Sequence, residues 1–303
     1  MVIAVHTAQA FTRISMPVHF LAHYGQMGVQ LFFVASAYTL CHSWIRRQSE
    51  RNHLAKFYLR RFFRIAPLYY FAILIYFSVH QIDQALQGAQ SYTAINIAAN
   101  ILFIHGFYPP AHDSIVPGGW SIGTEMAFYL IFPALIAVFQ RLNLRSYIAW
   151  GIVALSIIPS LLNFALLRHV SISLTTMGGS FNNTFAYHEL FTQMPVFLIG
   201  IVAFYQHQRN DQSHSQYHRL SQFAFFLLFT TITLILAWYE GRYSFVIIPI
   251  SSGISFYFLM NIFRNVAKPG KILMSIGKAS YSMYDVSFSI LVVFTQVYCP
   301  AYS

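Results

Sequence analysis

The chain has 303 residues, of which 57% are hydrophobic and only 9% charged. Soluble globular proteins carry about 25% charged residues, so this composition excludes a soluble domain with an ordinary solvated surface. The net charge of +10 can indicate nucleic-acid binding, but in a membrane protein basic loop residues set the orientation of the chain. We therefore expect a polytopic helical membrane protein that contacts membrane lipid and does not bind nucleic acid.

Apolar windows of the length needed to cross a bilayer, about 20 residues, recur along the whole chain. They predict an all-α integral membrane bundle that forms a single domain, 1–303, with nine to ten membrane segments. In chain order, the predicted helices span 26–43, 62–80, 120–139, 147–166, 187–205, 220–238, 244–263 and 276–297. Two shorter apolar segments lie at 1–12 and 94–107. The second holds only 14 residues, which is typical of a re-entrant or tilted segment.

Basic residues predict the orientation of these segments. Seven of the 18 lysines and arginines lie between residues 41 and 64, against the single acid Glu50, whereas 81–93 contains none. By the positive-inside rule, the first connection faces the cytoplasm and the second faces outside. The later basic positions are also expected in the cytoplasm: Arg141, Arg145, Arg209, Arg219, Arg264, Lys268 and Lys271. All these assignments agree only if 94–107 enters the membrane and returns on the same side; a full crossing of that segment is the alternative.

Four groups of polar residues interrupt the apolar segments. A charged side chain at membrane depth costs roughly 2.5 kcal/mol or more, so each charged group needs a buried partner or a function. The groups are His6; Arg60, Arg61 and Arg64, which precede Pro67; Trp120, Ser121 and Glu125; and Tyr281, Ser282, Tyr284 and Asp285. The two cysteines, Cys41 and Cys299, form no C-x-x-C motif, and we expect neither a metal site nor a bound cofactor.

Each group has a structural interpretation beside a functional one. A histidine such as His6 can simply hydrogen-bond a neighbouring helix, and arginines at a helix mouth usually orient the chain. Arg61 and Arg64 are three residues apart and share a face if the helix has begun, so they could clamp a phosphate. Glu125 is either a functional carboxylate or the buried partner of one of these arginines. For Asp285 the sequence indicates no role.

Five stretches of the chain resemble, in order, the motifs of the membrane acyltransferase 3 family, which includes bacterial O-acetyltransferases of surface polysaccharides. The stretches are VIAVHTAQ, GQMGVQLFFVASAYTL, RRFFRIAP, WSIGTEMAFYLIFP and GKASYSMY. In the family they correspond to a first helix that ends in histidine, a Gly-x-x-Gly-Val helix, an Arg-Arg-x-x-Arg-Ile-x-Pro element, a Trp-Ser-x-x-x-Glu helix and a Gly-x-x-Ser-Tyr-Ser-x-Tyr helix. The resemblance covers nearly the whole chain.

The chain departs from the family pattern at two places. Family members have an Asp-Gly-Leu-Arg-Gly stretch ahead of the histidine, but only five residues precede His6. The first helix is therefore expected to be truncated, or its true start lies upstream. In the last helix the family often has a histidine after the Ser-Tyr-Ser-x-Tyr element, where this chain has Asp285 and Ser287.

The resemblance implies that an acyl group, most often acetyl from acetyl-CoA, is transferred to a sugar hydroxyl. Acyl-CoA is then a co-substrate, and the acceptor is a cell-surface polysaccharide or its lipid-linked precursor. His6 is the expected catalytic base, since a neutral histidine accepts a proton near the working pH. Glu125 is expected to complete the catalytic set by orienting an arginine or the histidine.

The remaining site residues are assigned on the same grounds. Arg61 and Arg64 are expected to bind the phosphates of acyl-CoA. Trp120, Ser121 and Tyr281 are expected to line the acyl or sugar path. The resemblance places the protein in the cytoplasmic membrane of a bacterium.

Two other functions stay open. A carrier of a lipid-linked sugar or small anion would also have polar residues within its helices, although the sequence contains no inverted halves and no paired broken helices. A family member that binds but does not turn over is suggested by the missing arginine ahead of His6.

Overall fold

The computed structural model describes residues 27–87, 92–112, 114–116, 118–141, 146–174, 181–209, 216–239 and 244–264, and every regular element within them is a helix. The predicted segments 1–12 and 276–297 lie outside these residues, and so do His6, Tyr281 and Asp285. The chain divides into two compact units. The described residues of 60–123 belong to the first unit, and those of 29–59 and 124–266 belong to the second. Each unit is described by itself.

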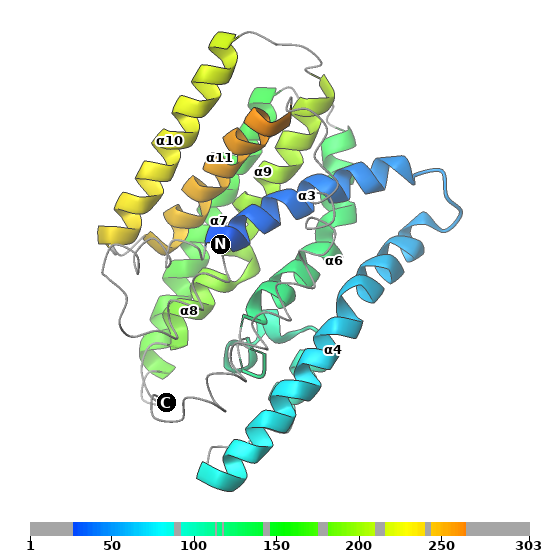
Figure 1. Ribbon diagram of the computed structural model, residues 1–303, viewed down its shortest axis with the longest axis vertical. Helices are drawn as coiled ribbons and strands as arrows, with labels where there is room; N and C mark the ends of the chain where they lie inside the picture. Colours follow the sequence, from blue (N-terminus) through cyan, green and yellow to red (C-terminus); the bar gives the residue numbers. More distant parts are fainter. Residues whose placement is uncertain are drawn as a thin grey trace. The chain divides into compact units, whose positions relative to one another are not determined.

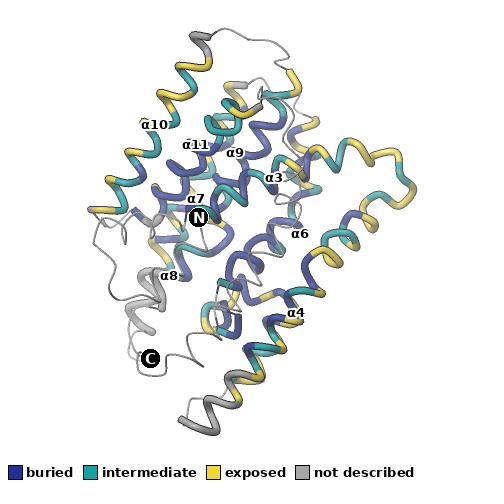
Figure 2. The backbone as a smooth tube through the Cα atoms, viewed as in Figure 1, coloured by how far each residue is buried: buried dark blue, intermediate teal, exposed yellow. Residues whose placement is uncertain are grey.

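The second unit is a bundle of apolar helices. Its helices are α3 (Gly28–Arg46), most of α6 (Trp120–Arg141), α7 (Ser146–Leu174), α8 (Phe181–His188), α9 (Leu190–Arg209), α10 (Gln216–Tyr239) and α11 (Ser244–Arg264). Helices α9, α10 and α11 run side by side, and α9 also packs against α7 (Figure 1). In Figure 2, α9 is buried along most of its length, so this helix forms the centre of the bundle.

A close crossing joins α3 to α9. A Cβ atom added to Gly200 would lie 2.4 Å from the backbone oxygen of Val34, so only a glycine allows the two backbones this near. Next to the crossing, the ring of Phe197 stacks on Phe33 at 4.4 Å and on Phe128 at 4.0 Å between centroids. Packing of aromatic rings therefore connects α3, α9 and α6.

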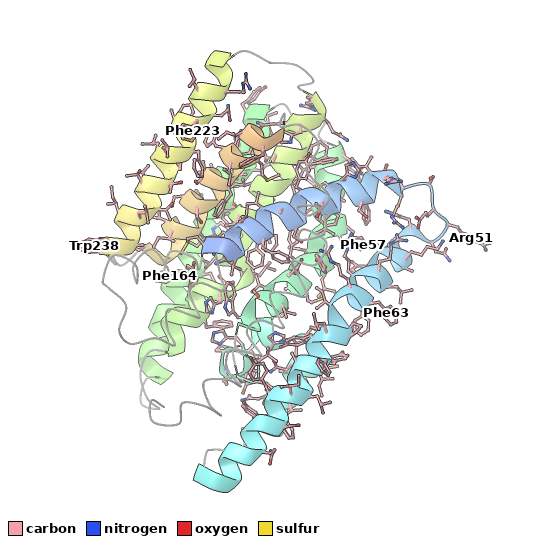
Figure 3. All side chains as sticks on the ribbon, viewed as in Figure 1. Arg51, Phe57, Phe63, Phe164, Phe223 and Trp238 are labelled. Atoms are coloured by element: carbon pink, nitrogen blue, oxygen red, sulfur yellow. The ribbon has the colours of Figure 1, made fainter. Side chains whose placement is uncertain are left out.

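Helix α10 lies at the edge of the bundle and packs mainly on α11. Two hydroxyl pairs join these helices: Thr230 with Ser255 at 2.7 Å, and Thr233 with Ser251 at 2.8 Å. Large apolar side chains cover the rest of α10, and Figure 3 shows Phe223 and Trp238 on its outer side. An apolar helix with so little protein contact is suited to contact with lipid.

Five helices in the described part are long and apolar enough to cross a membrane: 120–141, 147–167, 185–209, 219–238 and 246–263. They confirm the helices that the sequence predicted at 120–139, 147–166, 187–205, 220–238 and 244–263, and each is a candidate membrane span. The helices predicted at 26–43 and 62–80 also form, as α3 and α4 (His53–Gln87), but they are not among these five.

The predicted start of α4 was wrong by nine residues, since the helix begins at His53 instead of residue 62. Asn52 adopts a left-handed conformation with φ 56°, which turns the chain out of α3 and lets its carbonyl accept from the backbone N–H of Lys56. The early turns are then held by Phe57, whose ring packs against Trp44 and Phe132. The arginines of the RRFFRIAP stretch therefore lie inside a helix.

In the first unit, the rest of α4 is followed by the short helix α5 (Ala94–Ile101) and two 3-10 turns, η2 (His105–Phe107) and η3 (Pro109–Ala111). Thr93 caps α5 by accepting from the backbone N–H of Asn96. At 1.5 Å per residue, α5 is about 12 Å long. It is too short to cross the hydrocarbon layer of about 30 Å.

Candidate functional site

Glu125 is a buried carboxylate of the second unit, with only 1% of its surface exposed. Its Oε1 atom accepts a hydrogen bond from Ser36 Oγ at 2.7 Å and another from the hydroxyl of Tyr129, one turn along α6. Because Ser36 lies on α3, the carboxylate joins two helices. Two hydroxyl donors offset part of the cost of burying this acid.

This contact brings together two of the five motif stretches. Ser36 belongs to FFVAS, and both Glu125 and Tyr129 belong to WSIGTEMAFY. The sequence predicted an arginine or a histidine beside Glu125 and did not single out the two hydroxyl groups. Both hydroxyl groups belong to motif stretches on which the resemblance rests, so the motifs could have pointed to them. The spacing of residues in the sequence, however, does not show that α3 meets α6 at this point.

A second buried acid of the same unit, Glu189, has a structural role. Its carboxylate accepts from the backbone N–H groups of Phe191 at 2.6 Å and Thr192 at 2.7 Å, and from the Thr192 hydroxyl at 2.7 Å. These are the free donors at the start of α9, and a carboxylate there is stabilised by the helix dipole. Glu189 therefore caps a helix.

A polar cluster lies where α3 meets α8 and α9. The Nε2 atom of Gln30 is 3.2 Å from the hydroxyl of Tyr187 and 3.2 Å from Oε1 of Gln193. Gln193 in turn donates to the backbone oxygen of Tyr187 at 2.6 Å. Close by, the Thr124 hydroxyl donates to the backbone oxygen of His188 at 2.7 Å. Both glutamines are completely buried.

The first unit contains its own polar centre. The Tyr69 hydroxyl donates to Oδ1 of Asn100 at 2.7 Å and lies 3.3 Å from Nε2 of His105, which is 3.1 Å from the backbone oxygen of Gly119. A carbonyl can only accept, so Nε2 is assigned the proton in the neutral ring. A Cβ atom on Gly123 would lie 2.7 Å from this nitrogen, so the imidazole requires glycine at that position.

Asn100 extends this centre through the loop that leads into α6. Its Nδ2 atom is 2.9 Å from the backbone oxygen of Asn96, 3.3 Å from that of Ala111 and 3.2 Å from Ser114 Oγ. Gly118, with φ 75°, then turns the chain into α6. The start of α6 is thus held by the loop and by His105 together.

Burial lowers the pKa of His105 to about 4. His112 has its pKa lowered by burial as well, and its charge would oppose protonation of His105. His105 is therefore neutral at physiological pH. The sequence did not identify it, because a histidine in the stretch FIHGF carries no distinguishing spacing.

The predicted site residues fall in both units. Arg61 and Arg64 lie on α4 in the first unit, and their spacing of three within one helix places them on a common face, as predicted. Arg61 is half-buried and Arg64 is exposed. Trp120 and Ser121, at the start of α6 in the same unit, are buried, and Ser121 Oγ donates to the backbone oxygen of Gly118 at 3.0 Å. Within the described residues, no group of three or more His, Cys, Asp or Glu could hold a metal ion.

The all-helical architecture, the five candidate spans and the acid held inside them define a polytopic membrane protein. The family model described as an acyltransferase domain, acyltransferase 3, matches residues 1–303. The chain belongs to this family, which confirms the resemblance seen in its five motifs.

Two curated relatives share part of the sequence. Over 132 residues the chain is 32% identical to peptidoglycan O-acetyltransferase OatA of Listeria monocytogenes serovar 1/2a (strain ATCC BAA-679 / EGD-e), a match that covers 39% of this chain and 20% of the relative. Over 129 residues it is 27% identical to acyltransferase MdmB of Streptomyces mycarofaciens, covering 40% of this chain and 31% of the relative. The matches thus span less than a third of either relative. No solved structure matches the chain.

Proposed function

We propose that the protein is an integral membrane O-acyltransferase that moves an acetyl group from acetyl-CoA to a hydroxyl of a cell-surface polysaccharide or its lipid-linked precursor. The observation that carries the proposal is the buried Glu125, which is held by Ser36 and Tyr129 where two motif stretches of the acyltransferase family meet. The O-acetyltransferase activity named for OatA supports the same reaction class. We place the protein in the cytoplasmic membrane of a bacterium, where acetyl-CoA is available on one side.

The donor is bound by Arg61 and Arg64 in this proposal. A helix that presents two guanidinium groups on one face suits the phosphates of CoA, because each group forms charge-assisted, bidentate hydrogen bonds. The exposure of Arg64 supports this role, since an anion entering from water can reach it.

The chemistry requires a base, which we assign to His6. The base takes the proton of the acceptor hydroxyl, the hydroxyl oxygen forms an ester bond with the acetyl carbon, and the C–S bond breaks. The thiolate of CoA leaves and is protonated. Glu125 orients the polar groups around this reaction, and Trp120, Ser121 and Tyr281 line the path of the acyl group or the sugar.

The proposed membrane arrangement has nine to ten segments, with 94–107 as a re-entrant segment. The short α5 supports this arrangement, and so does the complete burial of His105 and Asn100. Irregular backbone at membrane depth is tolerated only where protein covers it or where it lines a water-filled cavity.

Transfer of labelled acetyl tests the function. Membranes containing the protein are incubated with [14C]acetyl-CoA and a cell-surface glycan fraction that mild base has stripped of ester-linked acetyl groups. We expect alkali-labile label on the glycan, and we expect Glu125→Gln to reduce the rate at least tenfold, because the amide keeps the shape but loses the charge that orients its partners.

The matched control is Glu50→Gln, which removes a carboxylate on an exposed turn, 3.3 Å from Arg47; its rate should equal that of the wild type. Absence of label with the wild-type protein would contradict the proposal and would favour a carrier or a family member without turnover. Full activity of Glu125→Gln would remove Glu125 from the mechanism.

A further inference from the structure

Beyond the residues assigned above, we propose that Gln30, Tyr187 and Gln193 form a subsite that binds a hydroxyl group of the acceptor sugar. The inference rests on the proposed function, since it requires an acceptor. All three residues belong to the second unit, and they come from α3, α8 and α9.

The amide of Gln30 is held in one orientation. Its Nε2 atom has two hydrogens, and the two acceptors within reach are the Tyr187 hydroxyl and Oε1 of Gln193, each 3.2 Å away. Reversing the amide would place two carbonyl oxygens opposite each other, because the Nε2 atom of Gln193 is already donating to the Tyr187 backbone. The position of Oε1 is thereby determined.

This oxygen is buried and has no hydrogen-bond partner among the described residues. A buried acceptor without a partner costs about 1–3 kcal/mol, and such groups in native structures call for an explanation. A ligand that brings an O–H donor would satisfy the oxygen. Gln30 thus offers an acceptor that is already oriented, which is what recognition of a hydroxyl requires.

The depth of the cluster favours the acceptor over the donor. Gln193 precedes Arg209 by 16 residues on α9, which lies within a candidate membrane span. Along this helix the separation corresponds to about 24 Å, against a hydrocarbon thickness of about 30 Å. Because the Arg209 end is expected in the cytoplasm, the cluster lies in the outer half of the membrane, where a surface glycan arrives.

The chemistry of the cluster suits a neutral polyol. The cluster offers the neutral amide oxygen of Gln30, which accepts from a hydroxyl without attracting a charge, while the amide of Gln193 is used in orienting Gln30. The neighbouring acid, Glu189, is occupied in capping α9. The rings of Tyr187 and His188 meet edge to face at 5.3 Å, and an aromatic surface of this kind packs well against the apolar face of a sugar.

The test measures the two substrates separately. Gln30→Met keeps the length of the side chain but removes its polar atoms. With [14C]acetyl-CoA and the base-treated glycan fraction as probes, we expect the KM for glycan to rise about tenfold while the KM for acetyl-CoA stays within twofold of the wild type. Tyr187→Phe should raise the KM for glycan by a smaller factor, because Gln30 keeps its oxygen but loses one of the partners that orient it.

Gln206→Met is the matched control, because it removes another interhelical amide, one that bonds the Tyr257 hydroxyl near the opposite end of α9. Its KM for glycan should not change. An unchanged KM for glycan in Gln30→Met, or an equal rise in both KM values, would overturn the inference and indicate a structural role or a bound water. If Gln30→Met does not accumulate in the membrane, Tyr187→Phe provides the test: its KM for glycan should rise while its KM for acetyl-CoA does not. Failure of the proposed function is separate, since it would show as an inactive wild type.

Discussion

At the scale of single residues, the cost of burial separates the polar side chains into different roles. Glu125 and Glu189 are both buried acids, but Glu189 is satisfied by the first N–H groups of α9, whereas Glu125 joins α3 to α6 through hydroxyl groups. Capping is a local interaction and needs no function. A carboxylate held between two motif stretches is the better candidate for a role in the reaction.

The role of Arg64 is tested by the donor dependence of the rate. In the proposed function, Arg64→Ala removes a charge-assisted hydrogen bond to the donor worth about 1.5–3 kcal/mol, so the KM for acetyl-CoA should rise at least tenfold while the KM for glycan changes little. Initial rates over a range of acetyl-CoA concentrations measure this. Arg47→Ala, which removes an exposed arginine that pairs with Glu50, should leave both KM values unchanged. Equal donor dependence in the two variants would argue against a phosphate site at Arg64.

The lowered pKa of His105 predicts how stability depends on pH. The folded protein binds this proton only near pH 4, whereas the unfolded chain binds it near 6.5. The stabilisation is therefore complete above about pH 6.5 and is lost as the pH falls towards 4. At pH 5 the loss amounts to about 2 kcal/mol.

Thermal unfolding in detergent at pH 7.5 and pH 5 measures this dependence. The unfolding midpoint of the wild type should fall on acidification by more than that of His105→Gln, which has no proton to take up. His42→Gln, at an exposed position on α3, should behave as the wild type does. Identical pH dependence in the wild type and His105→Gln would show that His105 does not carry the effect.

At the scale of elements, the existence of the helices was easier to predict than their ends. Apolar windows located α6, α7, α9, α10 and α11 because each helix is long and its pattern is continuous. The start of α4 was missed because the sequence of its first turns contains many polar residues. These turns are held by contacts of Phe57 with Trp44 and Phe132. Contacts between residues distant in the chain are not visible in a hydropathy pattern.

The crossing of α3 and α9 predicts different effects for two glycines. Gly200→Ala places a Cβ atom 2.4 Å from the Val34 oxygen, so the helices must separate, at a cost of about 1–3 kcal/mol. Gly151→Ala on α7 meets nothing within 4 Å and should stabilise its helix by up to about 1 kcal/mol.

Unfolding midpoints in detergent measure both variants. Gly200→Ala should unfold several degrees below the wild type, and Gly151→Ala at or above it. Equal midpoints for the two alanine variants would mean that α3 and α9 do not approach closely at Gly200.

At the scale of the whole molecule, the chain is a member of the acyltransferase 3 family built from two compact helical units. Both units are discontinuous in sequence, and α4 and α6 each contribute to both of them. The candidate site residues follow this division, with Arg61, Arg64 and Trp120 in the first unit and Glu125 in the second. A segment-by-segment reading of hydropathy contains no information about such a division.

The sequence by itself determined the class of protein, its five candidate spans among the described residues and its family, because apolar content, segment length and motif order can be recognised without knowing the fold. Only the tertiary structure decided that Ser36 and Tyr129 hold Glu125, that His105 anchors the start of α6, and that Gln30 lies against Tyr187 and Gln193. The contacts of Ser36 with Glu125 and of Gln30 with Tyr187 and Gln193 join different helices, and such contacts depend on side-chain packing between segments far apart in the chain.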